Sequence, residues 1–277
     1  MHQNKVDEQY QKLLANTMLN GSFKENRTGI GAYSIFGYQM EIPIKYYFPL
    51  LTTKKVNMKA IFYELIWMLR GETNIRYLND HGVHIWDNWA SLDGELGPVY
   101  GFQWRHYNGD YYADWFGGVD QISNIVEQIK NNPTSRRMLL TAWNPSQIDD
   151  MQLPPCHCFA QFFVNRDKLS CQVYIRSNDV FLGCPFNIAQ YSLLTYILAK
   201  ATDLRPNKLI YTIGDAHLYQ NHLEQAREQM LREPYSLPSL TIHKELNSIE
   251  DIEEMIFDDI SINNYKHHPA LKATVAV

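Results

Sequence analysis

The chain has 277 residues, of which 45% are hydrophobic and 20% are charged, and its formal net charge is -5. This length fits one large or two small domains, and the hydrophobic share excludes an intrinsically disordered chain. The negative charge argues against a protein that mainly coats nucleic acid, so we expect no nucleic-acid partner.

Targeting and membrane signals are weak in this sequence. The first residues lack the basic start, apolar middle and small-residue cleavage site of a signal peptide. The longest apolar stretch, 186–199, is interrupted by Asn187 and Gln190 and is shorter than the roughly 20 residues that a membrane span needs. We therefore expect a soluble, cytoplasmic protein without a membrane partner, in which the four cysteines are reduced.

The first half of the chain contains three predicted elements. The N-terminal segment is amphipathic and predicts a helix that ends near Gly21. Residues 28–42 alternate in polarity, which is typical of a strand. Apolar residues in 57–71 recur with helical spacing, and Gly71 is expected to end that helix. Residues 72–118 are rich in Trp, Tyr and Gly and are predicted to be irregular.

The second half alternates between predicted helices and strands. Helices are expected at 119–133, at 185–202, where the segment is apolar almost all round and should be buried, and at 218–234. Strands are expected at 137–143, 157–164 and 168–176. No linker or repeat divides the chain, so we predict one domain over residues 1–277. Its fold class is α+β, with a largely meandering mixed β-sheet packed against separate helices.

The stretch LPPCHCFAQFF, residues 153–163, contains Cys156, His157 and Cys158 side by side. Zinc sites usually draw on two pairs of ligands with two to four residues between partners, and neither Cys171 nor Cys184 supplies a second pair. A redox pair would favour C-x-x-C. We therefore predict no metal site, and we interpret Cys158, which shares a strand face with Cys156, as a packing residue.

Cys156 follows two prolines, and this position distinguishes it from the other thiols. Proline cannot donate to a sheet ladder and often stands at the first residue of a strand. Cys156 is therefore predicted at the mouth of a strand, where a side chain can meet a substrate. From this stretch alone, both a structural cysteine and a nucleophile remain open.

Several arginines could stabilise a thiolate or bind a phosphate. Arg27 lies in the turn NRTG, Arg136 and Arg137 stand in tandem before a strand, and Arg176 and Ser177 end another strand. Guanidinium groups and a hydroxyl all donate to phosphate oxygens, so the pair at the strand end suits that ligand. The alternative is that these are ordinary surface arginines.

Other polar residues have settings that suit catalysis or binding. Glu64 is the one acid within an apolar helix, where desolvation would raise its pKa and suit proton transfer, although it could also lie on an exposed flank. Asn187 could pair with the N3–H and O4 of a uracil, or only cap its helix. His217 and Tyr219 could hold a sugar hydroxyl, and Trp86 could form an apolar wall for an aromatic ligand, or each could be structural.

Together these stretches resemble the thymidylate synthase family over essentially the whole chain. The motifs that carry the resemblance, in chain order, are NRTG, IWDNWA, GPVYGFQWR, NPTSRR, LPPCH, RSNDVFLGCPFN, GDAHLYQNH and the C-terminal VAV. The resemblance implies methylation of dUMP to dTMP, with 5,10-methylenetetrahydrofolate as the one-carbon and hydride donor and without a metal. It also implies a homodimer, in which we expect the sheet to form the interface.

The resemblance also implies a role for each matching residue. Cys156 would attack C6 of dUMP, Glu64, His157 and Tyr100 would organise proton transfer, and Asp179 is implied as a further catalytic residue. The residues implied in nucleotide binding are Arg27, Arg176 and Ser177 for the phosphate, Arg136 and Arg137 for the phosphate bound by the partner subunit, Asn178, Asp179 and Asn187 for the base, and His217 and Tyr219 for the sugar. The residues implied in folate binding are Asn57, Trp86, Asp179, Leu182, Gly183, Phe186 and Ala276.

Three positions depart from the commonest pattern of that family. Asn57 stands where a folate-contacting histidine often occurs, Ile175 replaces a usual glutamine, and Asn178 stands where cysteine is frequent. Two alternatives stay open at this point. One is a hydroxymethylase acting on dUMP or dCMP, against which Trp86 and Asn187 argue, and the other is a nucleotide-binding protein without turnover.

Overall fold

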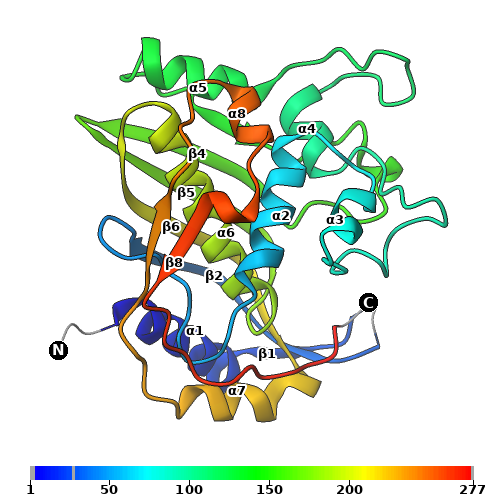
Figure 1. Cartoon of the computed structure of the whole chain (residues 1–277). Helices are drawn as coiled ribbons and strands as arrows, with labels where there is room; N and C mark the ends of the chain where they lie inside the picture. The colour runs from blue at the N-terminus through cyan, green and yellow to red at the C-terminus, as the bar shows by residue number, and fades with distance from the viewer. Residues whose placement is uncertain (1–3, 27–28, 276–277) are drawn as a thin grey trace.

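A six-stranded mixed β-sheet forms the centre of the protein (Figure 1). The computed structural model describes residues 4–26 and 29–275. The strands, in their order across the sheet, are β1 (Ser22–Lys24), β2 (Ala32–Pro43), β6 (Arg205–Tyr219), β5 (Lys168–Asp179), β4 (His157–Asn165) and β3 (Leu139–Thr141). A separate two-stranded antiparallel sheet pairs β7 (Ser239–Ile242) with β8 (Ile260–Asn263). The prediction of a mixed sheet packed against helices is thus confirmed.

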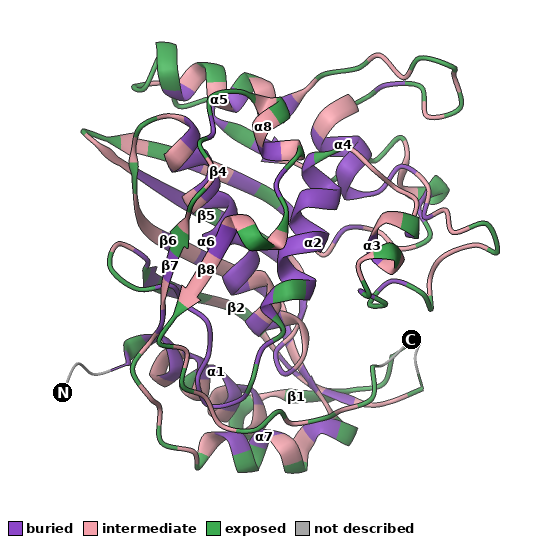
Figure 2. Ribbon diagram, in the orientation of Figure 1, coloured by how far each residue is buried: buried purple, intermediate pink, exposed green. Residues whose placement is uncertain are grey.

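Helices pack against one face of this sheet. The helices are α1 (Lys5–Asn20), α2 (Met58–Leu69), α3 (Arg76–Asp80), α4 (Tyr100–His106), α5 (Gln121–Asn131), α6 (Gly183–Ala201), α7 (Leu223–Met230) and α8 (Ile249–Glu253). Helix α6 lies on β5 and β6, α1 lies on β2, and α2 packs in turn on α6. Figure 2 shows α2 and α6 buried along most of their length, and the buried hydrophobic residues form one continuous core.

The central strand β6 is the main element that the sequence did not predict. It pairs antiparallel with β2 and parallel with β5, so β5, α6 and β6 form a crossover unit, and the sheet is not a simple meander. Pro206 near its start and Gly214 within it are residues that normally weaken a strand prediction. The predicted helix at 218–234 is also too long, since Leu218 and Tyr219 still belong to β6 and α7 begins at Leu223.

Helix α2 follows its sequence signals closely. The side chain of Asn57 caps its N-terminus by accepting a hydrogen bond from the N–H of Ala60 at 3.2 Å. Gly71 has a φ of 77°, and its N–H donates to the carbonyl of Met68, so the helix ends where glycine was expected to end it. This helix therefore places Glu64 about two turns from its capped end, inside the core.

The region 72–118 is less irregular than predicted, because it contains α3 and α4. Both helices are short and have no side-chain cap, so a periodic pattern had little length in which to emerge. Helix α4 nevertheless buries Tyr100, Phe102 and Trp104 against the core. Across the described residues, no helix combines the length and the apolar character that a membrane span requires.

The face of the sheet away from α6 exposes apolar side chains. In β4 and β5, alternate residues point to this face, among them Phe159, Phe163 and Tyr174, and Phe163 is 62% exposed. Trp143 and Leu139, beside β4, are also exposed. A sheet face of this kind is a typical surface for another protein chain.

Candidate active site

Cys156 lies immediately before β4, at the strand mouth where the sequence placed it. Its N–H donates to the hydroxyl of Tyr100 at 2.7 Å, and its carbonyl accepts from the N–H of Arg176 at 2.8 Å. The backbone of Cys156 is therefore fixed from α4 on one side and from β5 on the other. It is the one cysteine of the four that is not buried.

The other three thiols are poorly suited to nucleophilic attack. Burial raises the pKa of Cys158, raises that of Cys171 to about 12, and raises that of Cys184 further. A β-bulge between His157 and Phe159 interrupts the regular alternation, so the simple two-residue rule that placed Cys156 and Cys158 on one face does not hold strictly here. Cys158 instead packs with its sulfur 3.5 Å from the carbonyls of Pro155 and Cys156.

Arg176 holds the segment that presents Cys156. Its Nε donates to the carbonyl of Pro155 at 2.8 Å, and its Nη2 donates to that of Pro154 at 3.1 Å. Its guanidinium also lies over the ring of Trp143. Positive charge beside a cysteine favours the thiolate. The half-buried Ser177 adds a hydroxyl at the same strand end.

A surface depression of about 390 Å³ lies next to Arg176. It is lined by Thr141, Trp143, Cys158, Phe159, Tyr174 and Arg176.

Glu64 points into the core and binds two side-chain donors. The indole N–H of Trp86 donates to Oε1 at 2.7 Å, and the amide of Gln190 donates to Oε2 at 2.7 Å. Burial raises the pKa of Glu64 to about 7, and the two hydrogen bonds offset only part of this rise. The direction agrees with the sequence prediction. Gln190 was missed as a site residue, although a polar side chain in the apolar helix α6 was the available signal.

His157 belongs to an aromatic cluster next to Cys156. Its ring stacks on Tyr100 with centroids 4.0 Å apart, and its Nδ1 lies 2.8 Å from the hydroxyl of Tyr191. Burial lowers the pKa of His157 to about 3, so its ring is neutral at ordinary pH and does not supply the positive charge for a thiolate. Trp86 lies against Tyr100 and links this cluster to Glu64. Tyr191 is a second residue that the sequence analysis missed.

Two asparagines meet where β5 passes into α6. The amide nitrogen of Asn178 donates to Oδ1 of Asn187 at 3.3 Å, and the hydroxyl of Tyr211 donates to Oδ1 of Asn178 at 2.9 Å. Asn178 is buried, whereas Asn187 is half-buried. This arrangement fixes the Asn187 amide from behind, and such a fixed amide can serve as a donor and an acceptor for a flat polar ligand.

The turn 179–182 joins β5 to α6 and is held by partners from distant parts of the chain. Oδ1 of Asp179 accepts from the N–H groups of Phe181 and Leu182 at 2.8 and 3.0 Å, which is an Asx turn. The hydroxyl of Tyr10 donates to the carbonyl of Val180. The ammonium of Lys54 donates to the carbonyl of Phe181 and lies over its ring. These contacts position the second carboxylate oxygen of Asp179.

Lys54 is a third residue that the sequence analysis did not single out. It is buried, and this burial lowers the pKa of its ammonium to about 8. Its signal in the sequence was faint, since a lysine followed by a second lysine resembles a solvated surface.

His217 and Tyr219 lie at the end of β6, beside Asp179. In the parallel register, Asp179 is opposite His217. Nδ1 of His217 is 3.3 Å from Oδ1 of Asp215, and this contact is the largest cause that lowers the pKa of Asp215 to about 2. The rings of His217 and Tyr219 pack edge to face. His217 and Tyr219 thus lie at the same end of the sheet as Arg176 and Asp179, where the parallel strands β5 and β6 both finish.

Arg136 and Arg137 do not join this group within one chain. Both are exposed just before β3, the edge strand. Leu139 pairs with Gln161, and Gln161 pairs with Gln172. At a rise of about 3.3 Å per residue, this register places Arg137 roughly 20 Å from Arg176 along the strand direction. The two arginines therefore lie at a different part of the sheet from the end of β5 that carries Arg176.

The residues predicted to bind folate have mixed positions. Leu182, Gly183 and Phe186 are half-buried around the turn 179–182, and Trp86 is buried next to Glu64. Asn57 is exposed and caps α2. Arg27 and Ala276 lie outside the described residues.

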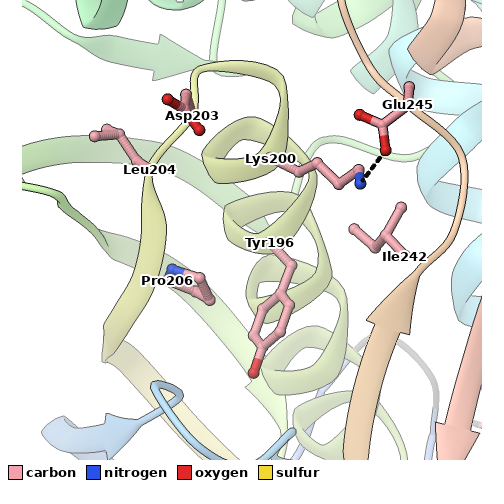
Figure 3. Close-up of a pocket in the computed structure, with 7 residues that line it drawn as sticks. All are labelled: Tyr196, Lys200, Asp203, Leu204, Pro206, Ile242 and Glu245. Atoms are coloured by element: carbon pink, nitrogen blue, oxygen red, sulfur yellow. Dashed lines mark hydrogen bonds and ion pairs between the residues drawn. The ribbon is translucent and has the colours of Figure 1, made fainter.

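Within residues 4–26 and 29–275, no group of three or more His, Cys, Asp or Glu side chains could hold a metal ion. A cavity of about 290 Å³ lies at the C-terminal end of α6, away from the predicted site residues, and Figure 3 shows the side chains that line it. It is lined by Tyr196, Lys200, Asp203, Leu204, Pro206, Ile242 and Glu245.

The comparison with known families adds one finding to this geometry. A family model described as Thymidylate synthase matches residues 8–277. The match includes Cys156, Glu64 and the turn 179–182, so it covers every element that builds the site.

Proposed function

Because the chain belongs to the thymidylate synthase family, we propose that it methylates C5 of dUMP and releases dTMP. In this reaction 5,10-methylenetetrahydrofolate supplies the one-carbon unit and a hydride, and it leaves as dihydrofolate. The observation that carries the proposal is the position of Cys156, half-exposed at a strand mouth, with the Arg176 guanidinium bonded to the carbonyls of the two prolines that precede it.

The nucleotide would lie along the sheet edge formed by the ends of β5 and β6. Arg176 and Ser177 would bind its phosphate, with Arg27, because a guanidinium and a hydroxyl both donate to phosphate oxygens. Asn187 would pair with the uracil edge, and its attachment to Asn178 supports one fixed orientation of the amide. His217 and Tyr219 would hold the sugar hydroxyl.

Covalent catalysis would begin with the thiolate of Cys156. Its sulfur adds to C6 of the uracil, and the electron pair of the C5–C6 double bond is delocalised over C5 and the C4 carbonyl oxygen as an enolate, which makes C5 nucleophilic. Once C5 has bonded to the one-carbon unit, loss of the C5 proton would expel tetrahydrofolate and leave an exocyclic methylene on the ring. Hydride transfer to this methylene would then complete the methyl group, re-form the C5–C6 double bond and expel the sulfur. Glu64 suits the proton transfers of this sequence, because a pKa of about 7 lets it exchange a proton near neutral pH.

The surroundings of the turn 179–182 also fit a flat reduced folate. Oδ2 of Asp179 has no hydrogen bond from any described residue, so it can accept N–H groups from a ligand. Leu182 and Phe186 offer half-buried apolar surface nearby. Exclusion of water by this surface matters, because water could otherwise capture the one-carbon unit and divert the product to a hydroxymethyl nucleotide.

We further propose that the active unit is a homodimer. Arg136 and Arg137 are too far from Arg176 to contact the same phosphate in one chain, so a second copy would have to bring them there. The exposed apolar face of β4 and β5, which includes Phe159, Phe163 and Tyr174, supports the sheet as the dimer interface. In this arrangement each nucleotide would contact both subunits.

The product of the reaction tests the proposed function. The purified protein is incubated with dUMP and 5,10-methylenetetrahydrofolate, dihydrofolate formation is followed by absorbance, and the nucleotide is weighed by mass spectrometry. We expect a nucleotide heavier by one methyl group, with stoichiometric dihydrofolate. A hydroxymethyl nucleotide with unoxidised tetrahydrofolate would falsify the proposal, and nucleotide binding without any product would favour a binding protein.

A mixing experiment tests the shared site. Arg136→Glu and Cys156→Ser variants are each expected to be inactive, yet a hybrid dimer contains one site with both native groups. Activity should therefore return after subunit exchange. The matched control replaces Arg136→Glu by Arg227→Glu, an exposed arginine on α7, which should be active before mixing. No recovery after exchange has been verified with tagged subunits would count against shared arginines.

A further inference from the structure

His222 is a fully buried histidine between the C-terminal segment, residues 264–275, and the turn 179–182. It ends a short 3-10 helix (Gln220–His222) directly before α7, and its exposed fraction is 0%. Its Nε2 lies 2.8 Å from the carbonyl of Thr274, and its Nδ1 lies 3.9 Å from Oδ2 of Asp179. The rings of Phe181 and Tyr219 pack against the imidazole, with centroids 5.5 and 5.7 Å from its own.

The two contacts fix the chemistry of the imidazole. A carbonyl can only accept, so Nε2 carries a proton and donates to Thr274. Nδ1 is buried and has no hydrogen-bond partner among the described residues. A buried polar atom in that state is costly, and the nearest charged group is the carboxylate of Asp179. One edge of the ring therefore engages the C-terminal segment, and the other edge faces the carboxylate at the site.

The C-terminal segment has weaker attachments at its other contacts with this region. Figure 1 shows it running beside α7. Asn221 and Gln225 donate to the carbonyls of Thr274 and Lys272 at 3.4 and 3.3 Å, and both hydrogen bonds are exposed. The contact from His222 is shorter and comes from a buried ring. It is thus the best defined connection between this segment and the core near Asp179.

We propose that His222 is a positioning residue that couples the seating of the C-terminal segment to the occupancy of Asp179. This inference rests on the proposed function, in which Asp179 contacts the ligands. A donor that binds Oδ2 of Asp179 changes the charge that Nδ1 faces, and the same rigid ring holds Thr274. Because such coupling is reciprocal, a seated segment also favours the ligand-bound carboxylate.

Two substitutions separate the two edges of the ring. A glutamine amide nitrogen can reach the position of Nε2, so His222→Gln should keep the hydrogen bond to Thr274 and remove the group that faces Asp179. An asparagine amide nitrogen mimics Nδ1, so His222→Asn should lose the hydrogen bond to Thr274. The matched control is His268→Gln, because His268 also contacts a backbone carbonyl, that of Glu233, through Nε2 and lies in the same segment.

The readout is hydrogen exchange of the C-terminal peptide, measured by mass spectrometry with and without dUMP plus tetrahydrofolate. Without ligand, His222→Asn should exchange about fivefold faster in this peptide than the wild type, and His222→Gln should exchange at the wild-type rate. With ligands, the wild type and His268→Gln should gain protection there, and His222→Gln should gain much less. Peptides of α1 and α6 report any general loss of structure.

The result that would overturn the proposal is ligand-dependent protection of the C-terminal peptide in His222→Gln equal to that in the wild type. Wild-type exchange of this peptide in a folded His222→Asn variant would overturn it as well. If His222→Asn does not fold, the comparison of His222→Gln with the wild type still decides. Hydrogen exchange needs no turnover, so a protein that makes no dTMP would refute the proposed function separately.

Discussion

Asp7 in α1 and Glu64 in α2 are both buried carboxylates, with exposed fractions of 0% and 9%, but their surroundings differ. Asp7 accepts hydrogen bonds from the N–H and hydroxyl groups of both Thr52 and Thr53, and from the amide of Asn4. Glu64 accepts only one indole N–H and one amide N–H among the described residues. Both carboxylates are thus buried, but Asp7 accepts many more hydrogen bonds than Glu64 does.

This difference separates an anchor from a group that can exchange a proton. Asp7 attaches the loop before α2 to α1, and Lys54, which supports the turn 179–182, follows directly after that loop. Glu64 has few donors, so burial prevails and its pKa rises to about 7. The number of hydrogen-bond donors, and not burial alone, thus distinguishes a structural carboxylate from a candidate catalytic one.

The largest expected effect comes from removing Cys156, the proposed nucleophile. Cys156→Ser should reduce kcat by about four orders of magnitude, because a serine hydroxyl in this place has no strong base to activate it. Cys158→Ser is the matched control, two residues away, and should stay within about threefold of the wild type. Steady-state kinetics at saturating dUMP and folate measure both. Equal losses in the two variants would contradict the assignment of Cys156.

The next effect contrasts the two carboxylates directly. Glu64→Gln should lower kcat by about 10²- to 10³-fold, since proton transfer is lost, while its free energy of unfolding at pH 8 should not fall. Asp7→Asn should lower the free energy of unfolding by about 3 kcal/mol, because its new N–H₂ group faces donors. Its kcat per folded molecule should change little. Urea unfolding and active-site titration separate the two quantities, and the opposite pattern would remove the distinction between anchor and catalyst.

Of these two buried carboxylates, only Glu64 could be singled out from the sequence. Glu64 stood out because a single acid in a long apolar helix has few other interpretations. Asp7 did not, since the residues that surround it, Thr52 and Thr53, come from a loop 45 residues away, and such contacts leave no local pattern. Strand β6 was not predicted for a similar reason. It is stabilised by pairing with β2 and β5 on its two sides, and its own residues give a weak strand signal.

The same limit explains the site residues that were missed. Cys156 and Arg176 could be proposed because strand ends carry local signals such as the two prolines. Gln190, Tyr191 and Lys54 contribute through contacts with residues far along the chain. The positions of Arg136 and Arg137 relative to Arg176 follow from the strand register, which the sequence does not supply.

The third expectation concerns pH and follows from the pKa of Glu64. In the folded state the pKa is about 7, above its ordinary value of 4.5, so the folded protein holds this proton more tightly than the unfolded chain. The stabilisation from protonated Glu64 is complete below pH 4.5 and is lost as pH rises towards 7. Relative to Glu64→Gln, the free energy of unfolding of the wild type should fall by about 3 kcal/mol as the pH rises over this interval. It should fall little more at higher pH.

Urea unfolding of the wild type and Glu64→Gln at several pH values between 4.5 and 8 measures this difference. The variant is the control, because every other titrating group is common to both proteins. A difference in unfolding free energy that stays constant across the interval would mean that Glu64 is ionised in the folded state throughout.

The smallest effect concerns the start of the helix that carries Glu64. Asn57→Ala should lower the free energy of unfolding by about 1 kcal/mol, because the N–H of Ala60 loses its capping acceptor. Asn57→Asp keeps that acceptor and should lose much less. Since Oδ1 of Asn57 already accepts from Ala60, we expect the folate KM of both variants to stay within about twofold of the wild type. A clear rise in KM in both, without a difference in stability between them, would instead support the folate contact that the resemblance implies. It would also mean that α2 needs no cap to hold Glu64 in the core, and that packing alone positions this carboxylate.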